Sequence, residues 1–425
     1  MSIADVFEAV AGPDAAVGFQ AYDGSKAGAP DAPVKITVRS PVAVSYLAQA
    51  PGALGLARAY VSGHLDVVGD MYFALARMAR AQMTHLDFSD RIRLLRQLGG
   101  PRVLIPRIPP PPQEVRVRRR SLSGRRHSKG RDASAISHHY DVSNTFYEWV
   151  LGPSMAYTCA CYPSEDATLE EAQWFKHDLV ARKLALRPGM RLLDVGCGWG
   201  GMVRHAAREY GVKALGVTLS EQQALWGQKA IEEQGLSDLA EVRHLDYRDV
   251  AETGFDAVSS IGLTEHIGKA QLPGYFEFLY GKLKPEGRML NHCITRTDNT
   301  EPARRPDGFI YRYVFPDGEL EAPGYLVSLM HDAGFEVRHE ENLREHYAKT
   351  LAGWCKNLDE HWDEAVAEVG EGTARVWRLY MAGSRLGFER NQIQLHQVLG
   401  VRLGDNGRSG MALRPDWEPV PAPVS

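Results

Sequence analysis

A run of eleven residues, Arg191 to Gly201, combines an acid with closely spaced glycines: RLLDVGCGWGG. The apolar residues around Asp194 predict a buried strand, and residues 202–210 predict a helix. Glycines at a helix start let backbone N–H groups approach a ligand closely. An acid two residues ahead of the first glycine is commoner in enzymes that bind S-adenosylmethionine (SAM), where it orients the amino-acid end of the cofactor. The candidate cofactor contacts of this loop are Asp194, Gly196, Gly198 and Gly200.

Two alternatives stand beside that interpretation. The glycines at 196, 198 and 201 also fit the Gly-x-Gly-x-x-Gly pattern of dinucleotide-binding folds. The loop is otherwise a turn with no ligand.

A second candidate contact follows the predicted strand Lys213–Thr218. Many nucleotide-binding enzymes carry an acid there for the ribose hydroxyls, but this chain continues with Leu219, Ser220 and, further on, Gln223. The hydroxyl of Thr218 and the amide of Gln223 are polar groups that suit a ribose. Ser220 with Gln223 also fits a helix capping box, and both roles are compatible. After the third predicted strand, Asp246, Tyr247 and Arg248 occupy the place where adenine contacts are expected.

Alternating strands and helices must position these residues. The expected strands are 191–195, 213–218, 240–245, 255–261 and 288–294, and the expected helices between them include 221–234 and 272–283. This order predicts an α/β fold with a parallel sheet and right-handed crossovers. Ligands of such sheets bind at the carboxyl ends of the strands, so the glycine loop, Thr218, Asp246 and Glu265 should surround one crevice.

Length and composition favour a two-domain protein. The chain has 425 residues, 44% hydrophobic and 24% charged, with a net charge of −4. Residues 1–105 predict a small α+β domain for lipid, membrane or dimer contact, with a strand at 34–39 and helices at 46–65 and 71–83, punctuated by Gly52 and Gly63. Residues 137–425 form the expected catalytic domain. Five cysteines without a regular framework indicate free thiols in a reducing cytosol. No signal peptide or membrane span is expected.

Residues 106–136 predict a mobile linker, because prolines at 106–112 are followed by eight basic residues without an acid. These are Arg116, Arg118, Arg119, Arg120, Arg125, Arg126, Lys129 and Arg131. A solvated linker with no binding role is one interpretation. Nucleic-acid binding is not favoured, because no aromatic residue is interleaved for base stacking. An anionic membrane surface is the partner that we favour.

Together these features resemble one family, the cyclopropane fatty acid synthases and mycolic acid cyclopropane synthases. The matching stretches are His138–Asn144, Tyr157–Ala160, Leu193–Gly201, Val217–Ser220, Asp246–Asp249, Glu265–Gly268 and Tyr313–Glu319. Residues 54–63 resemble the N-terminal part of the longer members. The resemblance implies a class I SAM-dependent methyltransferase domain, of Rossmann-like fold, with Tyr157 and Thr158 as further cofactor contacts.

Family members methylate the cis double bond of an acyl chain, and a bound bicarbonate ion removes a proton from the resulting carbocation. By motif position, the resemblance assigns the bicarbonate to Cys159, Glu265, His292, the backbone N–H of Ile294, and Tyr347. Taken alone, Cys159 is an ordinary small apolar residue, His292 a core histidine and Glu265 an acid at a helix start. The resemblance favours the catalytic roles of these residues. A raised pKa is expected for Glu265, because an anion would lie beside it.

One departure bears on the product. The family usually has an aromatic residue immediately before the glutamate, whereas this chain has Thr264. With the resemblance to an actinobacterial branch, this favours a methylene-branched chain over a cyclopropane ring. A flavin- or NADPH-dependent reductase would then act as a partner.

The expected enzyme is therefore a cytoplasmic, peripheral protein of the inner membrane face, and a homo-oligomer is possible. It acts on an oleoyl-like phospholipid chain. The alternatives are a SAM methyltransferase of a small polar metabolite and a non-catalytic lipid-binding protein.

Overall fold

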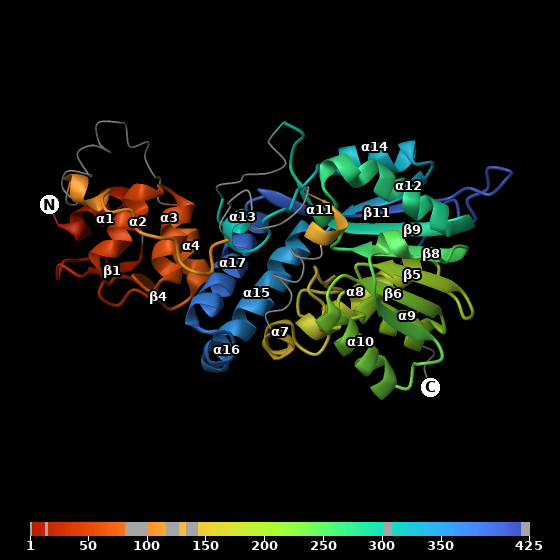
Figure 1. The fold of residues 1–425 in the computed structure, drawn as a ribbon, viewed down its shortest axis with the longest axis horizontal. Coiled ribbons are helices and arrows are strands. Elements are labelled where there is room, and N and C mark those ends of the chain that lie inside the picture. The colour runs from red at the N-terminus through yellow and green to blue at the C-terminus, as the bar shows by residue number, and fades with distance from the viewer. Residues whose placement is uncertain are drawn as a thin grey trace. The chain divides into compact units, whose positions relative to one another are not determined.

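The computed structural model describes residues 2–12, 16–80, 100–115, 127–132, 143–300 and 308–417. The chain divides into two compact units (Figure 1). Unit 1 comprises Met1–Ser121, Arg305–Pro316 and Trp354–Gly387, and unit 2 comprises Leu122–Arg304, Asp317–Gly353 and Phe388–Ser425. Each unit is made of three separate segments of the sequence, whereas the expected domains, divided at 105 and 136, were continuous ranges. The difference arises because late residues such as Ala382 pack in the core of unit 1, and local sequence carries no sign of that contact.

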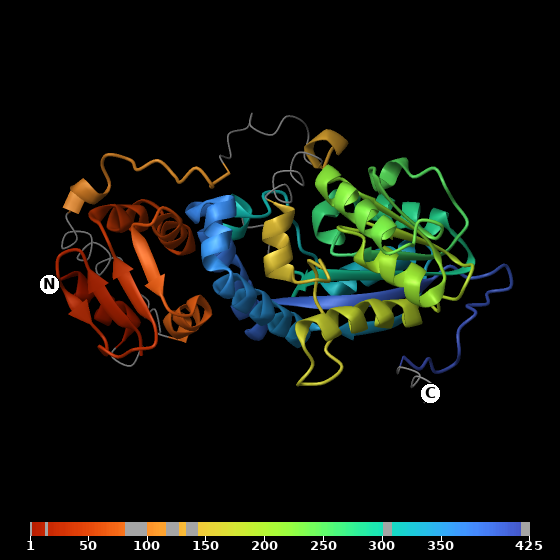
Figure 2. The same cartoon turned by 90° about the horizontal axis from the view of Figure 1, so that it is seen from below.

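Unit 1 contains a small sheet with helices packed on it. Its strand order is β2-β1-β3-β4, and Figure 2 shows these strands in red and orange. The strands are β1 (Gly18–Ala21), β2 (Lys26–Ala27), β3 (Lys35–Val38) and β4 (Leu65–Val68), and the helices include α1 (Ile3–Ala11), α2 (Pro41–Gln49), α3 (Ala53–Val61), α4 (Met71–Arg80), η1 (Gly100–Val103), α13 (Phe309–Tyr313) and α16 (Trp362–Val369). The α+β character expected of the N-terminal region is therefore present.

The helix expected at 46–65 is wrong as a single element. The chain breaks between α2 and α3 at Gly52, where φ is 94°, and residues from Leu65 pair antiparallel with β3. This strand forms because its alternate side chains, Leu65 and Val67, enter the core. The last three residues of the helix expected at 71–83 lie outside the described residues.

The described parts of the expected linker are attached to the units. In unit 1, the hydroxyl of Tyr46 donates to the Pro109 carbonyl at 2.8 Å, and Arg58 donates twice to Glu114 at 2.6 and 2.7 Å. In unit 2, Lys129 pairs with Asp249 and Arg131 pairs with Asp317. These contacts do not measure mobility, so the expectation of a mobile linker stays a prediction. The basic residues from Arg116 to Arg126 lie outside the described part.

Unit 2 is built on a seven-stranded sheet of order β10-β11-β9-β8-β5-β6-β7. The strands are β5 (Arg191–Val195), β6 (Lys213–Thr218), β7 (Ala240–His244), β8 (Phe255–Ile261), β9 (Leu283–Arg296), β10 (Glu336–Asn342) and β11 (Ile393–Val401). The five strands expected from the sequence are present and pair parallel. The sheet is mixed, however, because β11 pairs antiparallel with β9, and β10 antiparallel with β11.

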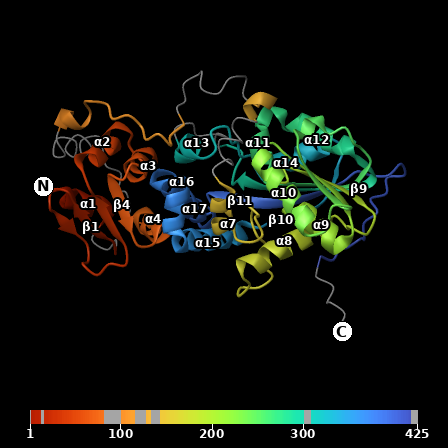
Figure 3. The same cartoon turned by 60° about the horizontal axis from the view of Figure 1, so that its bottom comes forward.

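Helices cover both faces of this sheet (Figures 1 and 3). One face carries α8 (Leu169–Lys183), α9 (Gly201–Tyr210) and α10 (Glu221–Glu233), and the other carries α12 (Leu272–Lys282) and α14 (Pro323–Asp332). Neighbouring residues of β5 face opposite ways, so Leu192 joins the first core and Leu193 the second. Shorter helices are α7 (Asn144–Leu151), η2 (Tyr247–Asp249), α11 (Thr264–Ile267) and η3 (Lys269–Gln271), and the unit boundaries fall within α15 (Arg344–Glu360) and α17 (Glu371–Glu389).

The five cysteines are free thiols. Within the described residues, no helix combines the length and apolar character needed to cross a bilayer.

Candidate functional site

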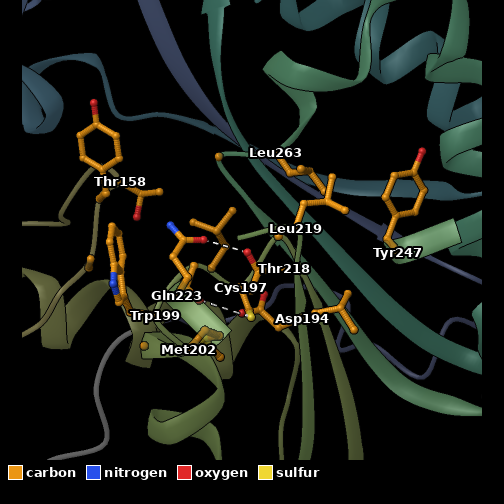
Figure 4. A pocket seen from close by; sticks show the side chains of 18 of the residues that line it. Thr158, Asp194, Cys197, Trp199, Met202, Thr218, Leu219, Gln223, Tyr247 and Leu263 are labelled. Carbon is orange, nitrogen blue, oxygen red and sulfur yellow. Dashed lines mark hydrogen bonds between the residues drawn. The ribbon is translucent and has the colours of Figure 1, made fainter. Parts of the chain in front are cut away.

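A pocket opens in unit 2 at the carboxyl ends of the parallel strands, as expected for an α/β sheet. It encloses about 1030 Å³ of empty space, part of it open to solvent. In Figure 4, Thr158 and Trp199 lie on one side of the pocket, and Leu263 and Tyr247 lie on the other.

The glycine loop forms one wall of the pocket between β5 and α9. Gly196 has a φ of 70°, in the left-handed region, and a Cβ there would lie 3.0 Å from the Cβ of Leu263. Gly198 also lines the pocket, whereas Gly200 does not. Gly200 is instead the N-cap residue of α9, with a left-handed backbone. Its expected contact with the cofactor is therefore not supported by the lining of the pocket.

Asp194 lies in the pocket with only 2% of its surface exposed. The hydroxyl of Ser259 donates to it at 2.6 Å, and burial raises the pKa of its carboxyl to about 7. A ligand cation such as an ammonium would therefore favour the ionised carboxylate.

Lys176 supplies a buried positive charge that the sequence interpretation missed. It lies on α8, is 1% exposed, and donates to the hydroxyl of Thr158 at 2.8 Å. Burial lowers its pKa to about 8, while the charge of Asp194 opposes that shift. The signal in the sequence is a lysine at core spacing, four residues after Ala172 and four before Val180, both fully buried. A carboxylate on the ligand would find a partner here.

Polar groups from β6 and α10 meet at the far wall. The hydroxyl of Thr218 donates to the side-chain oxygen of Gln223 at 2.7 Å, and Figure 4 shows Gln223 directed toward Thr218. Ser220 caps α10 by accepting from the backbone N–H of Gln223 at 3.2 Å. The N-cap bond of the expected capping box is therefore present, but its reciprocal bond is not, because the backbone N–H of Ser220 donates to the Thr218 hydroxyl at 3.3 Å.

Asp246 does not line the pocket, in contrast to its two neighbours Tyr247 and Arg248. Its carboxylate accepts the Arg248 guanidinium at 2.8 and 2.5 Å and caps η2. Arg248 also donates to Asp132 at 3.0 Å. Asp246 thus fixes the orientation of Arg248, and its expected direct contact with adenine is not among the lining positions.

Most of the expected cofactor residues converge on this one pocket. Those that line it are Tyr157, Thr158, Asp194, Gly196, Gly198, Thr218, Leu219, Gln223, Tyr247 and Arg248, and the missed ones include Asp132, Lys176, His177, Trp199 and His266.

A second candidate group is centred on Glu265, which lies on α11 and is not among the residues that line the pocket. Glu265 is 8% exposed, and one carboxyl oxygen, Oε1, accepts the backbone N–H of Ile294 at 2.6 Å. Its other oxygen, Oε2, is buried without a hydrogen-bond partner among the described residues. Burial raises the pKa of Glu265 to about 7, in the direction that the sequence predicted.

His292 lies two residues before Ile294, so the two side chains share one face of β9. The ring is fully buried, and its Nδ1 lies 3.1 Å from the amide nitrogen of Gln397. Its Nε2 has no hydrogen-bond partner within the described part of the chain. Burial holds the pKa of His292 well below its usual value, so the ring is neutral.

Cys159 and Tyr347 both contact the carbonyl of Leu343, one through its thiol and the other through its backbone. The Cys159 thiol faces the Leu343 carbonyl at 3.8 Å, and the backbone N–H of Tyr347 donates to the same carbonyl at 3.1 Å. The backbone N–H of Leu343 donates to the carbonyl of Leu395, and Leu395 on β11 pairs with Ile294 on β9. Burial raises the pKa of Cys159 far above that of an ordinary thiol, so it is a neutral hydrogen-bonding group rather than a thiolate.

Comparison with known proteins identifies the family. The sequence model of mycolic acid cyclopropane synthetase matches residues 127–398. A protein of Mycobacterium tuberculosis named "Probable fatty acid methyltransferase" is 58% identical over 411 residues, which cover 94% of each chain. The cyclopropane-fatty-acyl-phospholipid synthase of Escherichia coli is 31% identical over 382 residues, 88% of this chain and 90% of that protein.

A solved structure of a mycolic acid cyclopropane synthase, complexed with SAH and CTAB, is also similar. It matches with a TM-score of 0.60 and 32% identity, over 63% of this chain and 98% of its own. The expected class I methyltransferase fold is confirmed, and the chain is an enzyme of the SAM-dependent methyltransferase class. The similarity extends over most of the sequence, and the chain belongs to the mycolic acid cyclopropane synthetase family.

Proposed function

We propose that this enzyme transfers the methyl group of SAM to the cis double bond of an unsaturated phospholipid acyl chain, oleoyl-like in length. The coarser activity, fatty acid methylation or cyclopropane formation, follows from the family. The phospholipid substrate is supported by the E. coli relative, whose name is that of a fatty-acyl-phospholipid synthase and which covers both units.

The pocket residues suit SAM. The similar structure complexed with SAH supports this cofactor, and the pocket offers matching partners for each of its parts. Asp194 and Lys176 suit the ammonium and carboxylate of the amino-acid end, and Thr218 and Gln223 suit the ribose hydroxyls. When bound, SAM supplies an electrophilic methyl group on a sulfonium.

The observation that carries the proposal is that Oε2 of Glu265 and Nε2 of His292 are each buried without a hydrogen-bond partner among the described residues. Buried polar groups are normally hydrogen-bonded, so each of these atoms could take a small polar ligand as its partner. Bicarbonate would suit these atoms, because a neutral His292 can donate a hydrogen bond and a carboxyl with a pKa of about 7 can share a proton. Cys159, Glu265, His292, Ile294 and Tyr347 would hold it, and it would supply the base that removes the proton.

The proposed methyl transfer and proton loss balance without an oxidant. The π pair of the double bond forms the new bond to the methyl carbon, while the carbon–sulfur bond breaks and its electrons remain on sulfur. Loss of a proton from the transferred methyl carbon closes a three-membered ring. A hydride shift before that loss leaves an exo-methylene group instead. The residues around the cation therefore decide the product.

Thr264 supports the methylene product. It is 5% exposed, and its hydroxyl donates to the side-chain oxygen of buried Asn291 at 2.6 Å. The hydroxyl of Thr264 is engaged by Asn291, and a threonine fills less space beside Glu265 than the aromatic residue that is usual in the family. Room for the cation to rearrange would favour the hydride shift. A flavin- or NADPH-dependent reductase would then consume the methylene chain.

The test is an incubation of the purified protein with SAM and dioleoyl phospholipid vesicles, followed by mass and NMR analysis of the released chains. A chain longer by one carbon with an exo-methylene signal is expected. A cyclopropane signal alone would contradict the product and leave the methyl transfer intact. No lipid product, with methylation of a small polar metabolite instead, would favour the alternative methyltransferase. No turnover of either substrate would favour a non-catalytic lipid-binding protein.

We also propose a cytoplasmic protein bound peripherally to anionic lipid at the inner membrane face. The support is the basic stretch from Arg116 to Arg126, since acyl chains of a phospholipid substrate are reached from a bilayer surface.

A further inference from the structure

Two buried side chains lie behind His292, on the side away from its unpartnered Nε2. Gln397 on β11 lies 3.1 Å from Nδ1 of His292, and Lys183 on α8 lies 2.7 Å from the side-chain oxygen of Gln397. All three side chains have no exposed surface. Glu341 on β10 pairs with the same lysine ammonium from another side.

The chemistry of these groups fixes the direction of each hydrogen bond. A lysine ammonium has only donors, so the amide oxygen of Gln397 must face Lys183. The NH2 group of Gln397 is then directed to Nδ1 of His292, which must accept. A neutral imidazole whose Nδ1 accepts carries its hydrogen on Nε2.

We infer that Lys183 and Gln397 are positioning residues that hold His292 as the Nε2–H tautomer, so that it donates a hydrogen bond to the base of the methyl-transfer reaction. This inference rests on the proposed function for the identity of that base. The opposite tautomer would present a lone pair to an anion and repel it. Residues behind a histidine ligand commonly select its tautomer in this way.

The test compares wild type with Gln397→Glu at pH 9, where the imidazole is neutral. A glutamate keeps the size of the side chain and accepts from Lys183, but it also accepts from Nδ1–H and so reverses the tautomer. We expect kcat to fall about 10- to 100-fold, with the dissociation constant of SAM unchanged in calorimetry. The matched control is Gln394→Glu on the same strand, whose amide donates to Asn391, away from His292. It should keep the wild-type kcat.

The tautomer itself is measured by NMR of ¹⁵N-histidine-labelled protein, with the His292 signals assigned by their loss in His292→Gln. Wild type should show a protonated Nε2 and an unprotonated Nδ1, and Gln397→Glu the reverse. A protonated Nδ1 in wild type would overturn the inference without any variant. A reversed tautomer with full kcat would overturn it as well. A wild type that methylates no lipid would instead overturn the proposed function, and the NMR signals would still decide what Gln397 does.

Discussion

The carboxyl group of Asp194 has a pKa near neutrality because it is buried between β5 and β8, with one hydrogen bond from Ser259. Its charge state therefore changes around pH 7. The nearest compensating charge is that of Lys176, which lowers the pKa of Asp194. Cofactor binding at this site should thus depend on both residues.

The affinity for SAM should fall as the pH falls through about 7, the pKa of Asp194. The sign follows from the raised pKa, because the protonated carboxyl below that pH no longer pairs with the cofactor ammonium. Asp194→Asn should bind SAM about tenfold or more weakly, with no pH dependence from this group. Calorimetric titrations at a series of pH values measure both effects. An unchanged affinity between pH 6 and 8 in wild type would contradict the assignment.

Replacing Lys176 by methionine should move the midpoint of that pH dependence upward. The lysine charge favours the ionised carboxylate, so its removal raises the pKa of Asp194 further. The control is Lys229→Met on α10, where the ammonium is exposed and pairs with Glu233. Calorimetric titrations of both variants with SAM over the same pH series measure the two midpoints, and only that of Lys176→Met should move. Equal midpoints in Lys176→Met and wild type would contradict the coupling.

At the scale of elements, the turn between β5 and α9 depends on backbone that only glycine adopts readily. Gly196→Ala should destabilise the protein by about 1–2 kcal/mol and weaken SAM binding, because of its positive φ and the close approach of Leu263. Gly281→Ala in α12 is the matched control, since open space surrounds that position and alanine favours a helix. Thermal unfolding of both variants checks the prediction, and equal melting temperatures would refute it.

The sequence predicted the parallel part of the sheet and the glycine loop because their signals are local. Buried strands alternate with helices, and Asp194 precedes glycines at a fixed spacing. It did not predict β10, whose polar residues from Glu336 to Asn342 are nearly all partly exposed. Nor did it predict the role of Gln397, because Lys183 lies 214 residues away in sequence. Contacts at that separation leave no periodic pattern.

At the scale of the whole molecule, the chain forms two compact units. Unit 2 contains the pocket and the Glu265 group, while unit 1 combines N-terminal residues with Trp354–Gly387. Its discontinuous sequence explains why the predicted boundaries differ from the compact units. Among the basic residues of the expected linker, Lys129 and Arg131 are engaged by acids of unit 2.

Changing the arginines at 116, 118, 119, 120, 125 and 126 to glutamine should weaken binding to anionic vesicles in low salt. Each basic residue near an anionic surface contributes about 1 kcal/mol. Changing Lys129 and Arg131 to glutamine is the control and should alter vesicle binding far less, because both charges are already paired. Vesicle cosedimentation compares the two sets. Unchanged vesicle binding in the arginine variant would rule out this basic stretch as the membrane-binding segment.

The central claim is that a methyl group is transferred to an alkene and that the transferred carbon then loses a proton. The most direct test uses SAM with a trideuterated methyl group. The account predicts that the acyl chains of dioleoyl phospholipid vesicles gain one carbon with two of the three deuterium atoms, whether the product is a ring or an exo-methylene group. Retention of all three deuterium atoms in the product, or label found only outside the lipid, would contradict it.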